Sequence, residues 1–129
     1  MTKSLKRSRV LVATLLVLTL IISFNSKALA AGTWHSTTLD YAHTGSIKIY
    51  AGSNASFDLK VTGNSNLHFR IYVSNNSVPW RLVVSDIPAD GSITTINVSG
   101  GSSGYYTFFI YPSYGSSSGE TYHFYGRTS

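Results

Sequence analysis

The 129-residue sequence contains no cysteine, only three prolines, and 12% charged residues. The absence of cysteine excludes disulfide bridges, cysteine-ligated metal sites and a cysteine nucleophile. Charged residues make up about 25% of an ordinary globular protein, so charge is also scarce. A domain that lacks disulfides must be held together by its hydrophobic core, which is feasible for about 100 residues.

The charge that is present is unevenly distributed. Residues 1–30 carry five of the ten basic residues and no acidic residue, and residues 31–129 carry five of each. The formal net charge of +5 therefore belongs to the N-terminal segment, and the remainder is neutral when its histidines are neutral. This balance excludes a basic nucleic-acid-binding domain. The same remainder holds both tryptophans, all nine tyrosines and five of the six phenylalanines, which excludes a disordered chain.

The N-terminal segment has the organisation of a secretory signal peptide. A basic stretch over residues 1–9 precedes an apolar run from Val10 to Phe24, and Ala28-Leu29-Ala30 supplies the small residues that signal peptidase accepts. The alternative is a permanent membrane anchor, but a helix over this run would span roughly 22 Å of a core about 30 Å thick. We therefore expect cleavage after Ala30 and release of residues 31–129 as an extracellular protein without a stable membrane anchor.

The remainder of the chain is typical of an all-β domain. Turn-forming clusters of Gly, Ser, Asn and Pro recur about every ten residues, as in a sandwich or barrel, and no window shows a helical period. The stretches between the clusters are rich in Val, Ile, Thr, Tyr and Phe. They predict strands over 34–40, 46–51, 56–62, 66–73, 80–87, 92–99, 104–111 and 120–127.

Two of these stretches alternate clearly between apolar and polar residues. Phe57, Leu59 and Val61 share one face, and Phe69 and Ile71 belong to the apolar face of the next stretch. A three-residue hairpin loop over 63–65 would pair Leu59 with Phe69, and would place Asp58 opposite Arg70 and Lys60 opposite His68. The alternative is a corner that sends the second strand into a facing sheet, and alternation alone does not distinguish the two.

The stretch over 104–111 lacks a polar face. Tyr105, Thr107, Phe109 and Tyr111 alternate with Tyr106, Phe108 and Ile110. Such a strand is either covered on both sides or exposes an aromatic row to solvent. We expect the first arrangement.

The order of these features resembles the bacterial prepeptidase C-terminal (PPC) domain. The segments that carry the resemblance are Phe57-Asp58-Leu59-Lys60-Val61-Thr62-Gly63, Gly104-Tyr105-Tyr106-Thr107-Phe108-Phe109-Ile110, the loop 116–119, and Thr121-Tyr122-His123-Phe124. The resemblance covers roughly residues 46–126 and implies a single antiparallel, jelly-roll-like β-sandwich of about eight strands with an accessory or binding role. Two aspartates of the family motif, which can bind calcium, are Asn64 and Asn66 here. Because amides are weaker ligands than carboxylates for this cation, we expect no metal site there.

The sequence offers little catalytic chemistry. It contains no nucleophile motif and no cofactor-binding motif, so we predict a protein that is not an enzyme and needs no cofactor. His35, Asp40 and His43 form the one local cluster of titratable groups, for which we favour a solvated strand and turn over a metal site. Asp86 and Asp90 flank a predicted turn, where aspartates usually bond their own backbone.

Aromatic residues at strand ends and loops are the better functional candidates. Trp80 follows Pro79 at a strand start, Tyr111 and Tyr114 flank Pro112, and Trp34 opens the first strand. Such rings can stack on a sugar or lie at a membrane interface, although a tryptophan can equally cap the core. The other candidate surface consists of Asp58, Lys60, His68, Arg70 and Tyr72 on the polar face of the expected hairpin, for which we favour a solvated sheet face.

We therefore predict a small secreted, non-catalytic binding or accessory protein. Its partner would be a cell surface, a matrix component or a carbohydrate, recognised through Trp80, Tyr111, Tyr114 and Trp34. One alternative is a secreted membrane-active toxin or bacteriocin-like protein. The other is a secreted hydrolase inhibitor or an enzyme.

Overall fold

A computed structural model describes residues 32–63, 66–116 and 119–129. These residues do not include the expected signal peptide or its predicted cleavage site after Ala30. They also do not include Asn64. The described part consists of eight strands: β1 (His35–Thr38), β2 (Gly45–Ala51), β3 (Ser56–Thr62), β4 (His68–Asn75), β5 (Val78–Pro88), β6 (Thr94–Asn97), β7 (Gly104–Tyr114) and β8 (His123–Thr128). Each lies where the sequence predicted a strand. Within these ranges no helix is long and apolar enough to cross a membrane.

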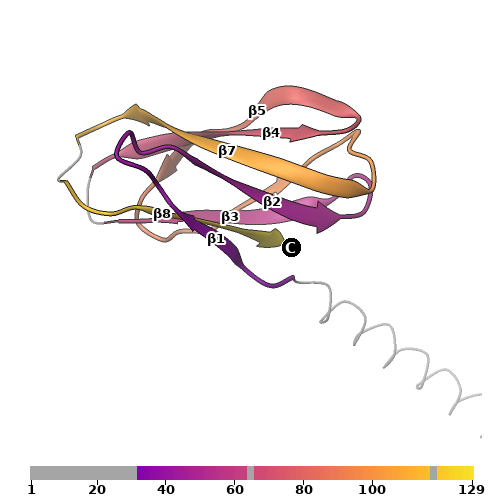
Figure 1. Cartoon of the computed structure of the whole chain (residues 1–129), viewed down its shortest axis with the longest axis horizontal. Coiled ribbons are helices and arrows are strands. Elements are labelled where there is room, and N and C mark those ends of the chain that lie inside the picture. Colours follow the sequence, from indigo (N-terminus) through magenta and orange to yellow (C-terminus); the bar gives the residue numbers. More distant parts are fainter. Residues whose placement is uncertain (1–31, 64–65, 117–118) are drawn as a thin grey trace, which may run out of the picture. The chain divides into compact units, whose positions relative to one another are not determined.

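The strands form two four-stranded antiparallel sheets packed face to face (Figure 1). One sheet has the order β1-β8-β3-β6 and the other has the order β2-β7-β4-β5. β4 pairs with β5, β3 with β6, β2 with β7 and β1 with β8, so the chain is a long antiparallel ribbon rolled around its own core. This pairing is that of a jelly roll, which confirms the predicted fold class.

The predicted hairpin between β3 and β4 is wrong, and the alternative corner is right. β3 pairs with β6 and β8, whereas β4 pairs with β5 and β7 in the other sheet. Asp58 is therefore opposite Thr95 and Arg127 instead of Arg70, and Lys60 is not opposite His68. Both arrangements bury the same side chains, which is why alternation predicted the faces correctly and the pairing incorrectly.

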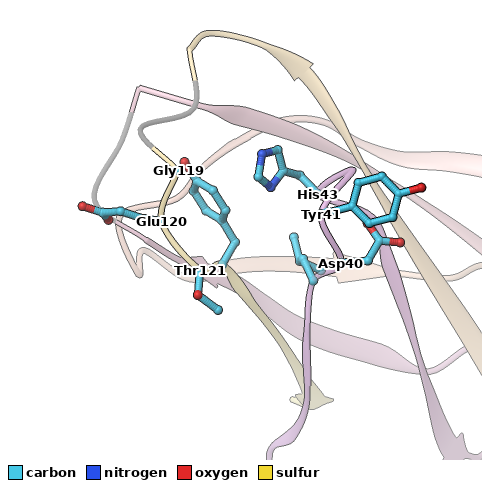
Figure 2. A pocket seen from close by; sticks show the side chains of 8 residues that line it. Asp40, Tyr41, His43, Gly119, Glu120 and Thr121 are labelled. Atoms are coloured by element: carbon cyan, nitrogen blue, oxygen red, sulfur yellow. The ribbon is translucent and has the colours of Figure 1, made fainter.

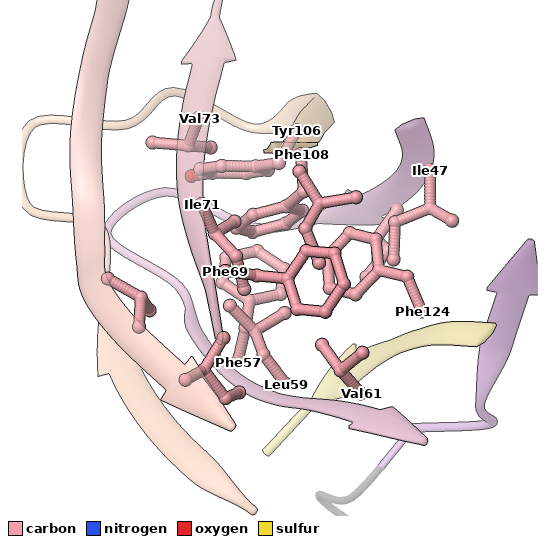
Figure 3. Packing of buried hydrophobic residues seen from close by; sticks show 14 of the residues in the cluster. Ile47, Phe57, Leu59, Val61, Phe69, Ile71, Val73, Tyr106, Phe108 and Phe124 are labelled. Atoms are coloured by element: carbon pink, nitrogen blue, oxygen red, sulfur yellow. The ribbon is translucent and has the colours of Figure 1, made fainter. Parts of the chain in front are cut away.

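The core lies between the two sheets (Figure 3). Leu59, Val61, Phe69 and Ile71 are fully buried, as the alternation predicted. Phe57 of one sheet meets Phe108 of the other with ring centroids 4.8 Å apart, a T-shaped contact across the interior.

Two local features make this close packing of the sheets feasible. The buried Tyr106 donates its hydroxyl hydrogen to the carbonyl of Gly52 at 2.7 Å, so its polar end is satisfied. Gly126 of β8 lies beneath β2, where a Cβ atom would come within 2.7 Å of the Ile47 Cδ1 atom. A larger residue at position 126 would therefore require core side chains such as Ile47 to shift.

Candidate functional site

Strand β7 exposes one of its two faces. Tyr106, Phe108 and Ile110 point into the core, whereas Tyr105 on the opposite face is 62% exposed. The prediction that this strand is covered on both sides is therefore wrong, and the alternative of an outward aromatic row holds. β7 is central within its sheet, between β2 and β4. The described part of the chain forms only two layers, so a central strand is still covered on one side only.

The row on β7 continues sideways onto the neighbouring strands. We call this surface the aromatic face. It consists of the outward rings on β2, β4, β5 and β7, namely Tyr50, Tyr72, Trp80, Tyr105, Phe109, Tyr111 and Tyr114. The antiparallel register brings these rings together, because it aligns Tyr50 with Tyr105 and Tyr72 with Phe109. Rings aligned across strands in this way stabilise the sheet as well as forming a surface.

Trp80 lies at the centre of a group of four rings. Its centroid is 4.9 Å from the ring of Tyr72, with the two planes inclined by 24°. It also lies 4.6 Å from Phe109 and 5.9 Å from Tyr111. Nevertheless Trp80 remains 48% exposed. The sequence left open whether this ring caps the core or faces solvent, and the structure shows a supported ring on the surface.

A second pair of rings lies toward one end of the aromatic face. Tyr50 of β2 and Tyr105 of β7 contact each other edge to face, with centroids 5.3 Å apart. Both rings are well exposed. Between this pair and the Trp80 group, Lys48 and Ser74 lie on either side of Thr107 in register, so a polar strip separates the two aromatic groups.

A polar cluster occupies the opposite end of the aromatic face. We call His68, Asp86 and Tyr114 the acceptor cluster. The His68 Nδ1 atom lies 2.6 Å from one oxygen of Asp86, and the Tyr114 hydroxyl donates to the other oxygen at 3.0 Å. The rings of His68 and Tyr114 stack 4.3 Å apart with planes inclined by 13°. The hydrogen bond to Asp86 raises the pKa of Tyr114, with smaller contributions from desolvation and the negative charge, so Tyr114 stays protonated and donates.

The acceptor cluster corrects one prediction from the sequence. Asp86 does not bond its own turn, because it lies within β5 and bonds side chains from β4 and β7. Asp90 behaves as predicted, since its carboxylate accepts a hydrogen bond from the backbone of Ser92 at 2.9 Å. The ring of Tyr114 was a candidate from the sequence, whereas the contribution of His68 and Asp86 required the register of three strands.

Trp34 lies on the other sheet, away from the aromatic face. Its ring centroid is 4.4 Å from Lys60 Nζ and 4.3 Å from Arg127 Cζ, two cation–π contacts. Beside it, Asp58 accepts hydrogen bonds from Thr95 Oγ1 at 2.7 Å and from Arg127 Nε at 3.0 Å. Trp34 therefore belongs to a network of contacts that fastens the start of the domain to β3 and β8.

The second candidate surface from the sequence does not exist as one surface. Asp58 and Lys60 lie on β3, and His68, Arg70 and Tyr72 lie on β4 of the other sheet. Asp58 is only 7% exposed, so it is not a solvated carboxylate as expected. On β4, Arg70 lies over the ring of Tyr72 at 5.9 Å and so contributes to the aromatic face.

A pocket of about 390 Å³ lies between the β1–β2 turn and the segment before β8 (Figure 2). Asp40, Tyr41 and His43 line one side, and Gly119, Glu120 and Thr121 line the other. The Asp40 carboxylate accepts hydrogen bonds from the backbone of Ala42 and Thr44 and from the Thr44 hydroxyl, which hold its own turn. These bonds, led by those from Thr44, lower the pKa of Asp40.

The cluster expected from the sequence, His35, Asp40 and His43, does not form a metal site. His35 lies in β1 opposite Gly126, whereas Asp40 and His43 lie in the turn that follows. The His43 ring instead packs edge-on against the buried ring of Tyr122, with centroids 5.0 Å apart. Within residues 32–63, 66–116 and 119–129, no three His, Cys, Asp or Glu side chains are placed to hold a metal ion.

Comparison with known proteins gives distant structural likenesses. No protein-family model and no curated protein matches the chain. A periplasmic inhibitor of g-type lysozyme from Aeromonas hydrophila, PliG, is 16% identical, with 78% of this chain and 88% of that chain covered and a TM-score of 0.47. The SPBc2 prophage-derived protein YomS is 13% identical, with 74% and 92% covered and a TM-score of 0.45. The Yersinia pseudotuberculosis-derived mitogen is 11% identical, with 75% and 83% covered and a TM-score of 0.44.

Proposed function

We propose that residues 31–129 form a secreted, non-catalytic binding protein whose binding surface is the aromatic face. One observation carries this proposal: Trp80 is 48% exposed although three neighbouring rings hold it in place. A large ring that is already positioned loses little conformational entropy when a partner covers it. Tryptophan and tyrosine are also the side chains that most often dominate binding energy.

The charges around the aromatic face favour an uncharged partner. The named charged residues of this face are two bases, Lys48 and Arg70, and one acid, Asp86, and the chain from residue 31 onward has five basic and five acidic residues. A partner attracted mainly by charge would need a larger excess of one sign than this single unit. We therefore expect binding through ring stacking and apolar contact, to a carbohydrate, a matrix component or a cell surface.

Several carboxylates that a hydrolase would need have structural roles. Asp40 and Asp90 hold their own turns, and Asp58 is engaged by Thr95 and Arg127. Asp86 accepts bonds from His68 and Tyr114 on an open sheet face. These engagements support a role in binding over one in catalysis.

The two tryptophans allow a matched test of this proposal. The purified domain would be applied to intact cells, matrix proteins, insoluble polysaccharides, immobilised hydrolases and lipid vesicles, and retention would be measured at low and high salt. We expect Trp80→Ala to weaken retention by at least about tenfold. Trp34→Ala and Lys60→Ala, both on the opposite sheet, should leave retention unchanged, and salt should have little effect.

Each variant would first be checked for an unchanged fold by circular dichroism. Loss of retention in Lys60→Ala with no effect of Trp80→Ala would overturn the proposal. Leakage from the vesicles would favour the membrane-active alternative. Retention by a hydrolase alone would favour the inhibitor alternative.

A further inference from the structure

Resting on the proposed function, we infer that the ligand of the aromatic face is an extended, neutral polysaccharide. It lies along β7, and the acceptor cluster binds its hydroxyl groups at one end. The inference depends on three properties of the face, which are its length, the chemistry of its rings, and the hydrogen-bonding capacity left over at the acceptor cluster.

The aromatic groups follow each other along the direction of β7. Tyr114 lies nine residue steps beyond Tyr105 on this strand, which at about 3.3 Å per step corresponds to roughly 30 Å. The Tyr50–Tyr105 pair lies toward one end, the Trp80 group includes Phe109 and Tyr111 of β7, and the stacked rings of His68 and Tyr114 lie at the other end. A ligand that contacts all three must be about as long as the face, because a single sugar or small apolar molecule would cover only one of them, and an extended chain meets this requirement.

The ring types favour a sugar polymer over a lipid. Five of the seven rings on this face are tyrosines, which present an apolar ring and a hydroxyl group together. A sugar unit is similarly divided, with apolar C–H groups on its ring faces and hydroxyls around its rim. The polar strip of Lys48, Thr107 and Ser74 interrupts the aromatic surface and offers further hydrogen bonds.

Counting only the described residues, the acceptor cluster has unused capacity to accept hydrogen bonds. A carboxylate offers about four lone-pair sites, and Asp86 is contacted by His68 and Tyr114. The Tyr114 oxygen donates its hydrogen and keeps its own lone pairs for a further donor. Asp86 remains accessible, with 47% of its side chain exposed. A ligand rich in hydroxyl donors complements this cluster, whereas an anionic group placed beside Asp86 would be repelled by its carboxylate.

Arg70 supplies the complementary donor on the same face. It lies opposite Tyr111 in register and over the ring of Tyr72, between the Trp80 group and the acceptor cluster. A chain passing from Trp80 to Asp86 would therefore meet a donor and then a group of acceptors. This order suits the ring oxygens and hydroxyls of a neutral glycan.

The test begins with an array of linear neutral polysaccharides alongside anionic polysaccharides, matrix proteins and lipid vesicles. Oligosaccharides of increasing length, prepared from the polymer that is captured, would then be titrated by calorimetry. We expect capture of at least one neutral glycan, lost in Trp80→Ala. The affinity should rise with oligosaccharide length until the chain reaches roughly 30 Å and then level off.

The role of the acceptor cluster is tested with Asp86→Asn, which preserves size and removes the charge. We expect a loss of affinity of about tenfold for the oligosaccharide that fills the face. O-methylation of the oligosaccharide should weaken binding to the wild type by a larger factor than it weakens binding to Asp86→Asn, because some of the hydrogen bonds that methylation removes are already weakened in the variant. Lys60→Ala, which lies on the other sheet, serves as the control.

The outcomes separate this inference from the proposed function. Suppose that Trp80-dependent capture is seen only with an anionic polymer, a protein or a vesicle. The proposed binding face would then stand, and the inference that its ligand is a neutral polysaccharide would be wrong. An affinity independent of chain length, or an unchanged affinity in Asp86→Asn, would overturn the placement of the ligand along β7. If no ligand binds in a Trp80-dependent manner, the inference and the proposed function both fail.

Discussion

Trp80 of β5 stacks on Tyr72 of β4, with ring centroids 4.9 Å apart and planes inclined by 24°. Tyr72 is contacted on this sheet face by Arg70 as well, at 5.9 Å. The indole is thus held by its neighbours while it remains 48% exposed. An exposed ring fixed in one orientation is what a surface that binds by stacking requires, and the ring of Trp34 on the other sheet is instead engaged by Lys60 and Arg127.

The assignment of strand faces is tested with two phenylalanines of opposite orientation. Phe69→Ala should lower the free energy of unfolding by about 3–5 kcal/mol, because this ring is fully buried between the sheets. With a total stability of roughly 5–15 kcal/mol, the variant should be barely folded. Phe109→Ala on the outer face is the matched control and should cost less, since its ring is only partly buried. Urea unfolding measures both, and equal losses would show that the faces are assigned incorrectly.

The burial of alternate residues could be predicted from the sequence because it depends on local periodicity. Leu59 and Phe69 must both point inward whichever sheet each strand joins, so the same alternation suits a hairpin or a corner. The choice between the two depends on the pairing of β3 with β8 and of β4 with β7, which brings together residues far apart in sequence. No local pattern contains that information.

The candidate site was predictable only in part, for a similar reason. Trp80, Tyr111 and Tyr114 were singled out as large rings near turns, and the structure places all three on one sheet face. Asp86 and His68 are 18 residues apart and lie on adjacent strands with an irregular register. Their contact, and the stacking of Tyr114 on His68, depend on that register.

The turn held by Asp40 should contribute stability that depends on pH. Hydrogen bonds from Thr44 and Ala42 lower the pKa of this carboxyl below its ordinary value of 3.8 in the folded state. Its contribution is therefore present above pH 3.8 and is lost as the pH falls through the lower folded value. Unfolding of the wild type and of Asp40→Asn would be compared across this range. The difference between them should shrink on acidification, and a difference that grows would contradict this account.

Calcium should leave the stability of the domain unchanged. Asn66 is exposed, and Asn64 lies outside the described residues. The resemblance proposed from the sequence would place aspartates of the PPC motif at these two positions. Without those carboxylates a hard cation lacks charged ligands. Millimolar calcium should therefore not shift the Tm in scanning calorimetry. A rise of several degrees would reveal a site built from other groups.

Processing of the N-terminal segment remains a prediction from the sequence. The small residues Ala28 and Ala30 predict cleavage that leaves Ala31 as the first residue of the secreted protein. Expression in a secreting host, followed by intact-mass analysis of the medium, measures the cleavage site. A full-length product retained in the membrane would show that the segment is an anchor.

The central claim is that partners bind over Trp80, and single-tryptophan fluorescence tests it most directly. The chain has two tryptophans, so Trp34→Phe leaves Trp80 as the one reporter and Trp80→Phe leaves Trp34. Each variant would be titrated with a ligand retained by the wild type, while quenching by acrylamide is recorded. The account predicts that the ligand protects Trp80 from quenching and does not alter the quenching of Trp34. Protection of Trp34 with no change at Trp80 would contradict it.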